Sequence, residues 1–575
     1  MKFFREEAAK LICEANAHVG AGAAVGAGSF NLAADDVMSL FSTPPDADMG
    51  DISVPCFKLA GALKLNPKDA ALKLSEKILG SLDKKSCISG VKNVGPYVNF
   101  FINTEKLYEL CAKFDPSQQR KKNKKTVVID YSSPNIAKPL AFHHIRSTAI
   151  GNIIGNIFEH CGYNVARINY LGDWGTQFGK LITAFKKYGD DKKLEKDGIK
   201  HLLDIYVSYH KDENDELEKQ ARSWFQKMEA GDKEALSYWK RFRDISIKEF
   251  DRVYKRLGVS FTNIEGESFY NGKTDKIIED VDKKIGTKES EGAIIADLSK
   301  YDMPPMLLKK TDGATLYATR DLTAAIDRWN RFKFDESLYV VAHQQELHFK
   351  QLFKVMELMG IDWYSKCKHI PFGLLHLADA KMSTREGNVI FMEDVLDRAV
   401  ELAEKAIEEK NPELQNKKEV AEMVGVGAVI FGDITKRRIQ NITFKWEEVL
   451  SFEGETAPYV QYTHARACSI LGKAGFKTSA AVKHYVPEGL ELEVLKMIYS
   501  MDDKIEEARV EHEPFILARY VLDLSKVFNK YYYQEKIIDV EDENKRNAKL
   551  HIVNKAKETI KACLGIMGVR SPDRM

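Results

Sequence analysis

The stretch VVIDYSSPNIAKPLAFHHIRSTAIGNIIGNIFEHCGYNVARINYL, residues 127–171, decides the fold class. Its first four residues are strand-like, residues 144–159 carry apolar side chains at helical spacing, and residues 165–171 are strand-like again. A strand, a helix and a second strand in this order form one βαβ unit. The same alternation continues with strand candidates at 293–298, 338–342 and 369–377 and a helix at 344–359. We therefore expect an α/β fold built on a Rossmann-like parallel sheet.

The pattern changes on both sides of this sheet. Residues 1–118 are predicted to form helices and loops that end in a strand-like segment, 94–102, and the basic run at 120–125 favours a linker over a patch that binds nucleic acid. Residues 184–257 are charged and helical, which predicts a helical insertion. From about residue 395 no strand pattern recurs, and apolar stripes favour helical packing. The predicted domains are an N-terminal α+β domain (1–118), the sheet domain (124–395), a helical connector (396–440) and an all-α bundle (441–575).

Composition limits the classes of function. The 575 residues hold 86 Lys and Arg against 85 Asp and Glu, so no overall charge indicates a nucleic acid or a membrane as partner. The eight cysteines are scattered, which argues against a zinc knuckle or a disulfide framework, and we predict no metal site. The N-terminus has no apolar signal core, and no segment has the length and apolarity of a membrane span. We expect a cytoplasmic protein.

Two loops of the sheet domain carry side chains suited to phosphates. Lys138, His143 and His144 lie between the first strand and its helix, where the helix N-terminus attracts anions. A second loop, KMSTREG at 381–387, follows the last strand candidate and supplies Lys381, Ser383 and Arg385. Either loop alone could be a solvated or helix-capping segment. Together they would meet at the carboxyl ends of the strands and hold a nucleotide.

Several further motifs occur in a specific order. SSPNIAKP and HIRST within 132–148, GDWGTQFGKLI at 172–182, TDGATLYATRDLTAAIDR at 311–328 and KMSTREG resemble the arginyl-tRNA synthetases, a class I aminoacyl-tRNA synthetase family. The same resemblance extends to the segments at 50–60, 93–103, 452–471 and 571–575. It therefore covers nearly the whole chain.

The resemblance implies an enzyme that activates L-arginine with ATP and Mg²⁺ to arginyl-adenylate and transfers it to the 3′-terminal ribose of tRNA(Arg). We expect a monomer without a membrane partner. The resemblance assigns the phosphate chemistry to Lys138, His143, His144, Lys381, Ser383 and Arg385. No protein nucleophile is needed, because positioning and charge stabilisation suffice for displacement at the α-phosphate.

Arginine presents a planar cationic fork that carboxylates can match. The resemblance places Asp321 and Tyr317, one helical turn apart, at the guanidinium. It assigns further contacts with arginine to Asp130, Ser133, Asn135 and Gln345. The C-terminal bundle resembles an anticodon-binding domain, and the N-terminal domain would also touch the tRNA. The candidate tRNA contacts are Tyr459, Gln461, Tyr462, Arg466, Tyr533 and Met575.

The chain departs from the family's His-x-Gly-His signature, because residues 141–144 read Ala-Phe-His-His. Three alternatives follow: His143 replaces the missing histidine, adenine shifts slightly, or the enzyme is slow or inactive. A non-catalytic tRNA-binding paralogue is therefore a second hypothesis. A small-molecule nucleotidyltransferase is a third, although it would not need the long helical C-terminal region.

Overall fold

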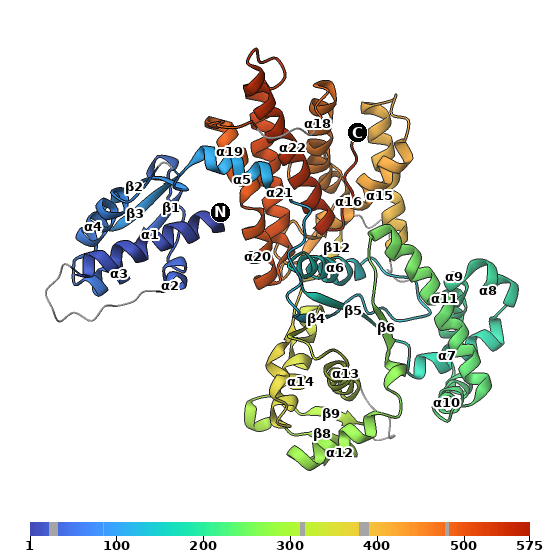
Figure 1. Cartoon of the computed structure of the whole chain (residues 1–575). Helices are drawn as coiled ribbons and strands as arrows, with labels where there is room; N and C mark the ends of the chain where they lie inside the picture. Colours follow the sequence, from blue (N-terminus) through green and yellow to red (C-terminus); the bar gives the residue numbers. More distant parts are fainter. Residues whose placement is uncertain (22–32, 84, 311–316, 379–389, 478–481) are drawn as a thin grey trace. The chain divides into compact units, whose positions relative to one another are not determined.

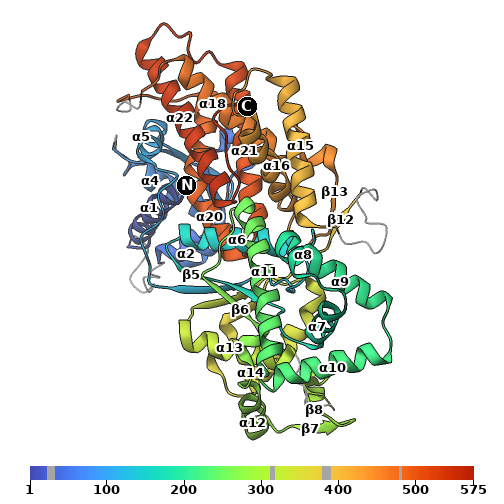
Figure 2. The ribbon, with the colours of Figure 1, turned by 90° about the vertical axis from the view of Figure 1, so that its right-hand side faces the viewer.

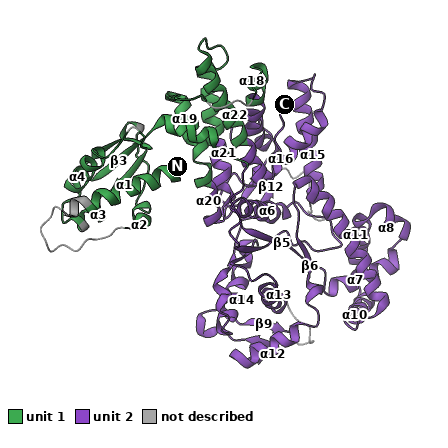
Figure 3. Cartoon of the chain, in the orientation of Figure 1, with its two compact units in different colours: residues 1–117, 467–504, 523–560 green, residues 118–466, 505–522, 561–575 purple. Residues whose placement is uncertain are grey.

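The computed structural model describes residues 1–21, 33–83, 85–310, 317–378, 390–477 and 482–575 (Figure 1). The chain divides into two compact units (Figure 3). Unit 1 comprises residues 1–117, 467–504 and 523–560, and unit 2 comprises residues 118–466, 505–522 and 561–575. Among the described residues, no helix has both the length and the apolar character that crossing a membrane requires.

A five-stranded parallel sheet forms the centre of unit 2, as predicted. Its strand order is β11-β10-β4-β5-β6. The strands are β4 (Thr126–Asp130), β5 (Asn164–Leu171), β6 (Asn263–Gly266), β10 (Glu336–Tyr339) and β11 (Cys367–His369). Helix α6 (His144–His160) lies on one side of the sheet, and α13 (Tyr317–Phe332) and α14 (Glu346–Leu358) lie on the other (Figures 1 and 2).

The core explains why these elements pack together. Val128 and Ile168 from the strands join Leu322 of α13 and Leu352 of α14 in one buried apolar cluster. Parallel strands buried on both faces read as apolar runs, which is why the sequence indicated this sheet. The arrangement places the carboxyl ends of β4, β6 and β10 along one edge.

Three strand predictions were wrong in detail. The segment at 293–298 forms β8 (Ala293–Ala296) in a separate antiparallel sheet with β7 (Lys288–Ser290) and β9 (Met306–Lys309). The segment at 369–377 is split between β11 and β12 (Leu375–Leu377), and Pro371, which cannot donate to a strand ladder, lies between them. A strand does occur beyond residue 395, because β12 pairs with β13 (Ile442–Phe444). Runs this short do not reveal which sheet they join.

Helices fill the segment between β5 and β6, as predicted for the insertion (Figure 2). They are α7 (Thr176–Tyr188), α8 (Asp191–Asp197), α9 (Ile199–Lys211), α10 (Asp215–Glu229) and α11 (Lys233–Leu257). Unit 2 also contains α12 (Thr274–Ile285), α15 (Met392–Lys410), α16 (Lys417–Asp433) and α17 (Trp446–Val449). A buried ion pair, Arg146 Nε to Asp433 Oδ1 at 3.0 Å, ties α6 to α16.

Long helices form the C-terminal region, as the apolar stripes predicted. They are α18 (Ala457–Lys473), α19 (Gly489–Tyr499), α20 (Met501–Glu511), α21 (Pro514–Gln534) and α22 (Glu543–Ile566). The N-terminal part of unit 1 holds α1 (Lys2–Ala21), α2 (Ala34–Met38), α3 (Phe57–Leu63), α4 (Pro67–Leu79) and α5 (Thr104–Lys113). It also holds an antiparallel sheet of β1 (Ile52–Pro55), β3 (Tyr97–Ile102) and β2 (Ile88–Val94), of which the sequence indicated only β3.

Candidate active site

The loop that follows β4 has a strained backbone. Ser132, Ser133 and Ala137 adopt left-handed conformations with φ of 70°, 48° and 68°. Such conformations cost about 1–3 kcal/mol each in residues other than glycine and persist only where the surroundings impose them. Here the amide of Ser133 donates to Asn169 Oδ1 at 3.1 Å, and that of Ala137 donates to Ser246 Oγ at 2.8 Å. Strain of this kind concentrates at functional sites.

The two predicted histidines close this loop at the N-terminus of α6. His143 is the exposed N-cap residue, and its ring centroid lies 4.3 Å from that of His144. Burial and the neighbouring His143 lower the pKa of His144 to about 4, so this imidazole is neutral at pH 7. Its Nδ1 lies 3.1 Å from both the amide nitrogen and the carbonyl oxygen of Ala141. Because the backbone engages Nδ1, Nε2 is the atom that can face a ligand.

Backbone hydrogen bonds join this loop to the chain that follows the second basic loop. The amide of Phe142 donates to the carbonyl of Ile390, and that of Met392 donates to the carbonyl of Leu140, both at 2.7 Å. The three predicted residues of that loop, Lys381, Ser383 and Arg385, lie outside the described residues. The described chain resumes at Ile390, directly beside the histidine loop.

Lys138 and Asn135 lie on the exposed side of the same loop. The Nζ atom of Lys138 lies 4.8 Å from the ring centroid of Tyr206, a cation–π contact worth about 0.5–1 kcal/mol at an exposed site. Asn135 forms an isolated bridge with Gly172, where an added Cβ would overlap its side-chain oxygen. The present position of the Asn135 side chain therefore depends on glycine at position 172.

A group of polar residues lies beyond the carboxyl ends of the strands; we call Glu267, Tyr317, Asp321 and His348 the sheet-edge cluster. Tyr317 and Asp321, which lie one helical turn apart on α13, both contact His348. Asp321 Oδ2 lies 2.7 Å from His348 Nε2, and its side chain is 21% exposed. Tyr317 is 55% exposed, and its ring centroid lies 5.0 Å from that of His348. His348 was not among the predicted site residues, although it lies three positions after Gln345, which was.

Glu267 is the second residue that sequence reasoning missed. It follows β6 directly, and Arg320 Nη1 donates to its carboxylate at 2.8 Å. Burial raises the pKa of Glu267 to about 7; the positive charge of Arg320 opposes this shift, and the negative charges of Asp321 and Asp173 add to it. The signal in the sequence was a carboxylate directly after a strand. The cluster thus holds more negative than positive charge and favours a cationic ligand.

Asp130 and Gln345 have different surroundings from the cluster. Asp130, at the end of β4, is buried, and Arg328 Nη1 donates to it at 2.7 Å. Ser133 Oγ donates to the same carboxylate at 3.0 Å. Burial raises the pKa of Asp130, and the guanidinium of Arg328 opposes the rise. Gln345 is exposed in the short helix η4 (His343–Gln345) directly before α14.

The GDWG block, residues 172–175, contacts both the segment after β6 and the helical insertion. The carboxylate of Asp173 is fully buried and accepts hydrogen bonds from the amide and the hydroxyl of Ser268 at 2.8 and 2.7 Å. The ring of Trp174 packs edge-on against Trp239 of the insertion helix α11. These contacts tie the insertion to the end of β6.

The predicted tRNA contacts in unit 2 differ in exposure. Tyr462 is 41% exposed on α18, and the Arg466 guanidinium lies 4.9 Å from its ring centroid. Tyr459, at the start of the same helix, is only partly exposed. Gln461 is fully buried, and its side-chain amide donates to the carbonyls of Met423 at 3.0 Å and Arg570 at 2.6 Å. Gln461 therefore has no surface for RNA, and we assign it to helix packing.

The last two predicted contacts lie in different units. Tyr533, in unit 1, is 71% exposed and contacts the ring of Tyr532. Met575, in unit 2, packs against the apolar cluster of α15 and α16, and its carbonyl accepts a hydrogen bond from Asn411 at 3.0 Å. The ring of Tyr533 is therefore accessible to solvent, whereas Met575 packs against α15 and α16.

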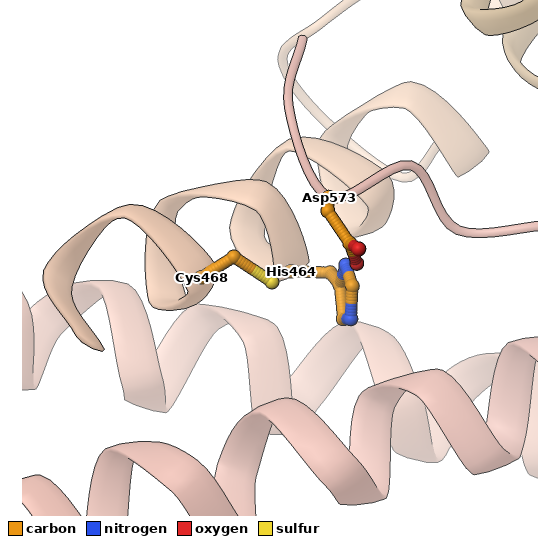
Figure 4. Close-up of side chains that lie close together, drawn as sticks. All are labelled: His464, Cys468 and Asp573. Atoms are coloured by element: carbon orange, nitrogen blue, oxygen red, sulfur yellow. The ribbon is translucent and has the colours of Figure 1, made fainter. Parts of the chain in front are cut away.

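Within the described residues, one group of side chains has metal-ligating chemistry. His464, Cys468 and Asp573 place one ligand atom each within 4.8 Å of one another (Figure 4). His464 Nδ1 also lies 3.1 Å from the carbonyl of Pro572. All three side chains have further interactions with protein groups, so their proximity does not by itself indicate an ion.

Three family models match successive parts of the chain. The model of the N-terminal domain of arginyl-tRNA synthetase matches residues 20–102, and that of the class I (R) tRNA synthetase catalytic domain matches residues 108–446. The DALR anticodon binding domain matches residues 460–575.

Relatives and solved structures agree with these models. An arginine–tRNA ligase of Halothermothrix orenii is 44% identical over 554 residues, 95% of this chain and 97% of that protein. Arginine–tRNA ligase 2 of Bacillus anthracis is 45% identical over 552 residues, with the same coverage. The structure of Thermus thermophilus arginyl-tRNA synthetase matches with a TM-score of 0.80 at 24% identity, over 98% of this chain and all of that one, and shows the shared fold.

Proposed function

Because this chain belongs to the arginyl-tRNA synthetases, the class I enzymes that ligate arginine to tRNA, we propose that the sheet-edge cluster is its arginine site. The observation that carries this proposal is the negative charge of two neighbouring carboxylates at the carboxyl ends of the strands, Asp321 and Glu267, of which Glu267 pairs with Arg320. A guanidinium beside the two carboxylates would balance this charge. Tyr317 offers its hydroxyl and ring to the same group.

The remaining predicted arginine contacts bind the amino acid directly or position other residues in this proposal. Ser133, Asn135 and Gln345 are further contacts for the amino acid. Asp130 acts through its neighbours, because it accepts hydrogen bonds from Arg328 and Ser133 and thereby fixes the loop after β4.

The histidine loop is the proposed phosphate site. With Nδ1 accepting the hydrogen bond from the amide of Ala141, neutral His144 carries its proton on Nε2 and donates from there to the α-phosphate. His143 replaces the family's first histidine. Lys138, Lys381, Ser383 and Arg385 supply further positive charge and hydrogen bonds. Mg²⁺ bound with ATP would supply further shielding of the phosphate charge. The carboxylate of arginine attacks the α-phosphorus, and the bond from that phosphorus to pyrophosphate breaks; these groups lower the barrier by stabilising charge on the adenylyl group being transferred and on the departing pyrophosphate.

The proposed tRNA contacts are the predicted residues whose side chains are wholly or partly exposed. Tyr462 and Arg466 form a stacking and phosphate-binding pair, with Tyr459 beside them, and Tyr533 is a second stacking face. Residues 1–118 are the proposed N-terminal tRNA-contacting domain, 124–395 the catalytic domain, 396–440 the connector and 441–575 the anticodon-binding bundle. Met575 supports the bundle. The proposed state is a cytoplasmic monomer.

The test of this function is transfer of labelled arginine to total tRNA in the presence of ATP and Mg²⁺. We expect acid-precipitable arginine that depends on both ATP and tRNA. A non-catalytic paralogue would retain tRNA on a filter without charging it, and that outcome would refute the proposed chemistry.

The pKa of Glu267 predicts a pH-dependent affinity for arginine. Its carboxyl group is ionised above a pKa of about 7 and loses its charge as the pH falls below that value. Because the guanidinium needs the ionised form, the KM for arginine should rise about tenfold from pH 8 to pH 6. Glu267→Gln removes the titrating group, so its KM should vary little over this range. ATP–pyrophosphate exchange at pH 6, 7 and 8 measures both; an equal slope in the variant would contradict the assignment.

Replacement of His143 tests which group substitutes for the missing histidine. We expect His143→Gly to raise the KM for ATP about tenfold or more, because a hydrogen bond to a charged phosphate is lost. Glycine is tolerated at a helix N-cap, so α6 itself should remain intact. ATP–pyrophosphate exchange at saturating arginine gives the result. An unchanged KM for ATP would eliminate His143 from the site.

A further inference from the structure

His348 makes a direct hydrogen bond to the carboxylate assigned to arginine. It is the third residue of α14, its side chain is 9% exposed, and its Nε2 lies 2.7 Å from Asp321 Oδ2. A carboxylate oxygen can only accept, so Nε2 carries the proton. Of the two carboxylate oxygens, this contact engages Oδ2 and leaves Oδ1 for a ligand.

The rings around His348 fix the direction of this donor. Its ring centroid lies 5.0 Å from that of Tyr317, at an interplanar angle of 60°, and 5.1 Å from that of Phe349, at 64°. Phe349 in turn stacks on His369 at 4.5 Å. An imidazole packed on two sides cannot rotate freely, so the bond to Asp321 has one orientation. A carboxylate held in this way presents Oδ1 in one direction.

We propose that His348 is a positioning and specificity-determining residue for arginine, acting through Asp321. The inference rests on the proposed function, in which Asp321 binds the guanidinium. A fixed carboxylate oxygen accepts an N–H of arginine but repels the carbonyl oxygen that citrulline, a neutral analogue of the same shape, carries in that place. A carboxylate free to change its side-chain conformation could move away from this oxygen, so holding it in place increases discrimination.

Two substitutions separate the hydrogen bond from the packing. His348→Phe keeps an aromatic ring between Tyr317 and Phe349 but removes the donor. His348→Gln places an amide N–H close to the position of Nε2. We expect His348→Phe to raise the KM for arginine about 10- to 100-fold and to weaken the preference for arginine over citrulline, with the KM for ATP unchanged. His348→Gln should recover the arginine KM to within about threefold of the wild type.

His210 provides a matched control. Its Nδ1 lies 2.7 Å from Glu213 Oε2 in the helical insertion, so it forms a histidine–carboxylate pair of the same length elsewhere in unit 2. His210→Phe should leave the KM for arginine unchanged. A melting curve of each variant shows whether a change in KM accompanies loss of the fold.

A double variant tests whether His348 acts through Asp321. If it does, Asp321→Ala, which removes the contact with His348, should have the same KM for arginine whether or not it is combined with His348→Phe. If the two substitutions instead raise the KM for arginine independently, so that their fold-changes multiply, the inference is wrong. An unchanged KM in His348→Phe would also overturn it, as would a His348→Gln variant as impaired as His348→Phe. An unchanged KM in Asp321→Asn would instead refute the arginine site itself, which keeps the two failures distinct.

Discussion

Asp321→Asn is expected to lower kcat/KM for arginine about 10²- to 10³-fold, almost entirely through the KM for arginine. Asparagine keeps the shape of the side chain and its contact with His348 but removes the charge that the guanidinium meets. Loss of one partner of a partly buried, hydrogen-bonded charge pair costs about 3–5 kcal/mol. Glu267 remains in the variant and still attracts arginine, which sets the lower end of the range. ATP–pyrophosphate exchange with tRNA present measures the effect.

Asp327 offers a control on the same helix. Its carboxylate is 24% exposed, against 21% for Asp321, and it pairs with Arg331 at 2.8 Å. Asp327→Asn should leave both KM values near those of the wild type. If the exchange rate of the Asp321→Asn variant depends on arginine concentration as that of the wild type does, the guanidinium binds elsewhere.

His144→Ala is expected to reduce the rate of arginyl-adenylate formation about 10²- to 10³-fold, with little change in the KM for arginine. The reason is that Nε2 stabilises charge that develops on the α-phosphate in the transition state, and loss of one such donor has this order of effect. The burial that lowers the pKa of His144 to about 4 keeps the imidazole neutral, so its contribution should not change between pH 6 and pH 8. Single-turnover formation of adenylate measures the rate.

The control for His144 is His484, an exposed histidine of unit 1 that lies 2.8 Å from Glu105. His484→Ala should leave the adenylation rate unchanged. A His144→Ala variant that forms adenylate at the wild-type rate would show that the α6 N-terminus does not act on the phosphate.

The parallel sheet was predictable because buried parallel strands are continuous apolar runs, and the helices between them carry regular apolar stripes. VVID and VARINYL became β4 and β5 on this basis. The weak points were short strands. Strand β13 and the pairing of β8 with β9 depend on tertiary contacts. Segments of three or four residues are too short to show a regular apolar pattern in the sequence.

The site was predictable where motifs keep a fixed spacing. Tyr317 and Asp321 share one helix face because a helix turn separates them, and both side chains contact His348. Glu267 and His348 come from segments far from Asp321 in the chain, and only folding makes them neighbours. Gln461 shows the opposite error: a polar residue in a motif was taken as a contact, but its side chain is buried and donates hydrogen bonds to two backbone carbonyls.

The most direct test of the arginine site is a crystal structure of the chain with L-arginine bound. We expect the guanidinium within hydrogen-bond distance of Asp321 Oδ1 and beside Glu267, with His348 Nε2 still bonded to Asp321 Oδ2. Arginine bound away from Asp321 and Glu267, with both carboxylates unchanged, would contradict the assignment.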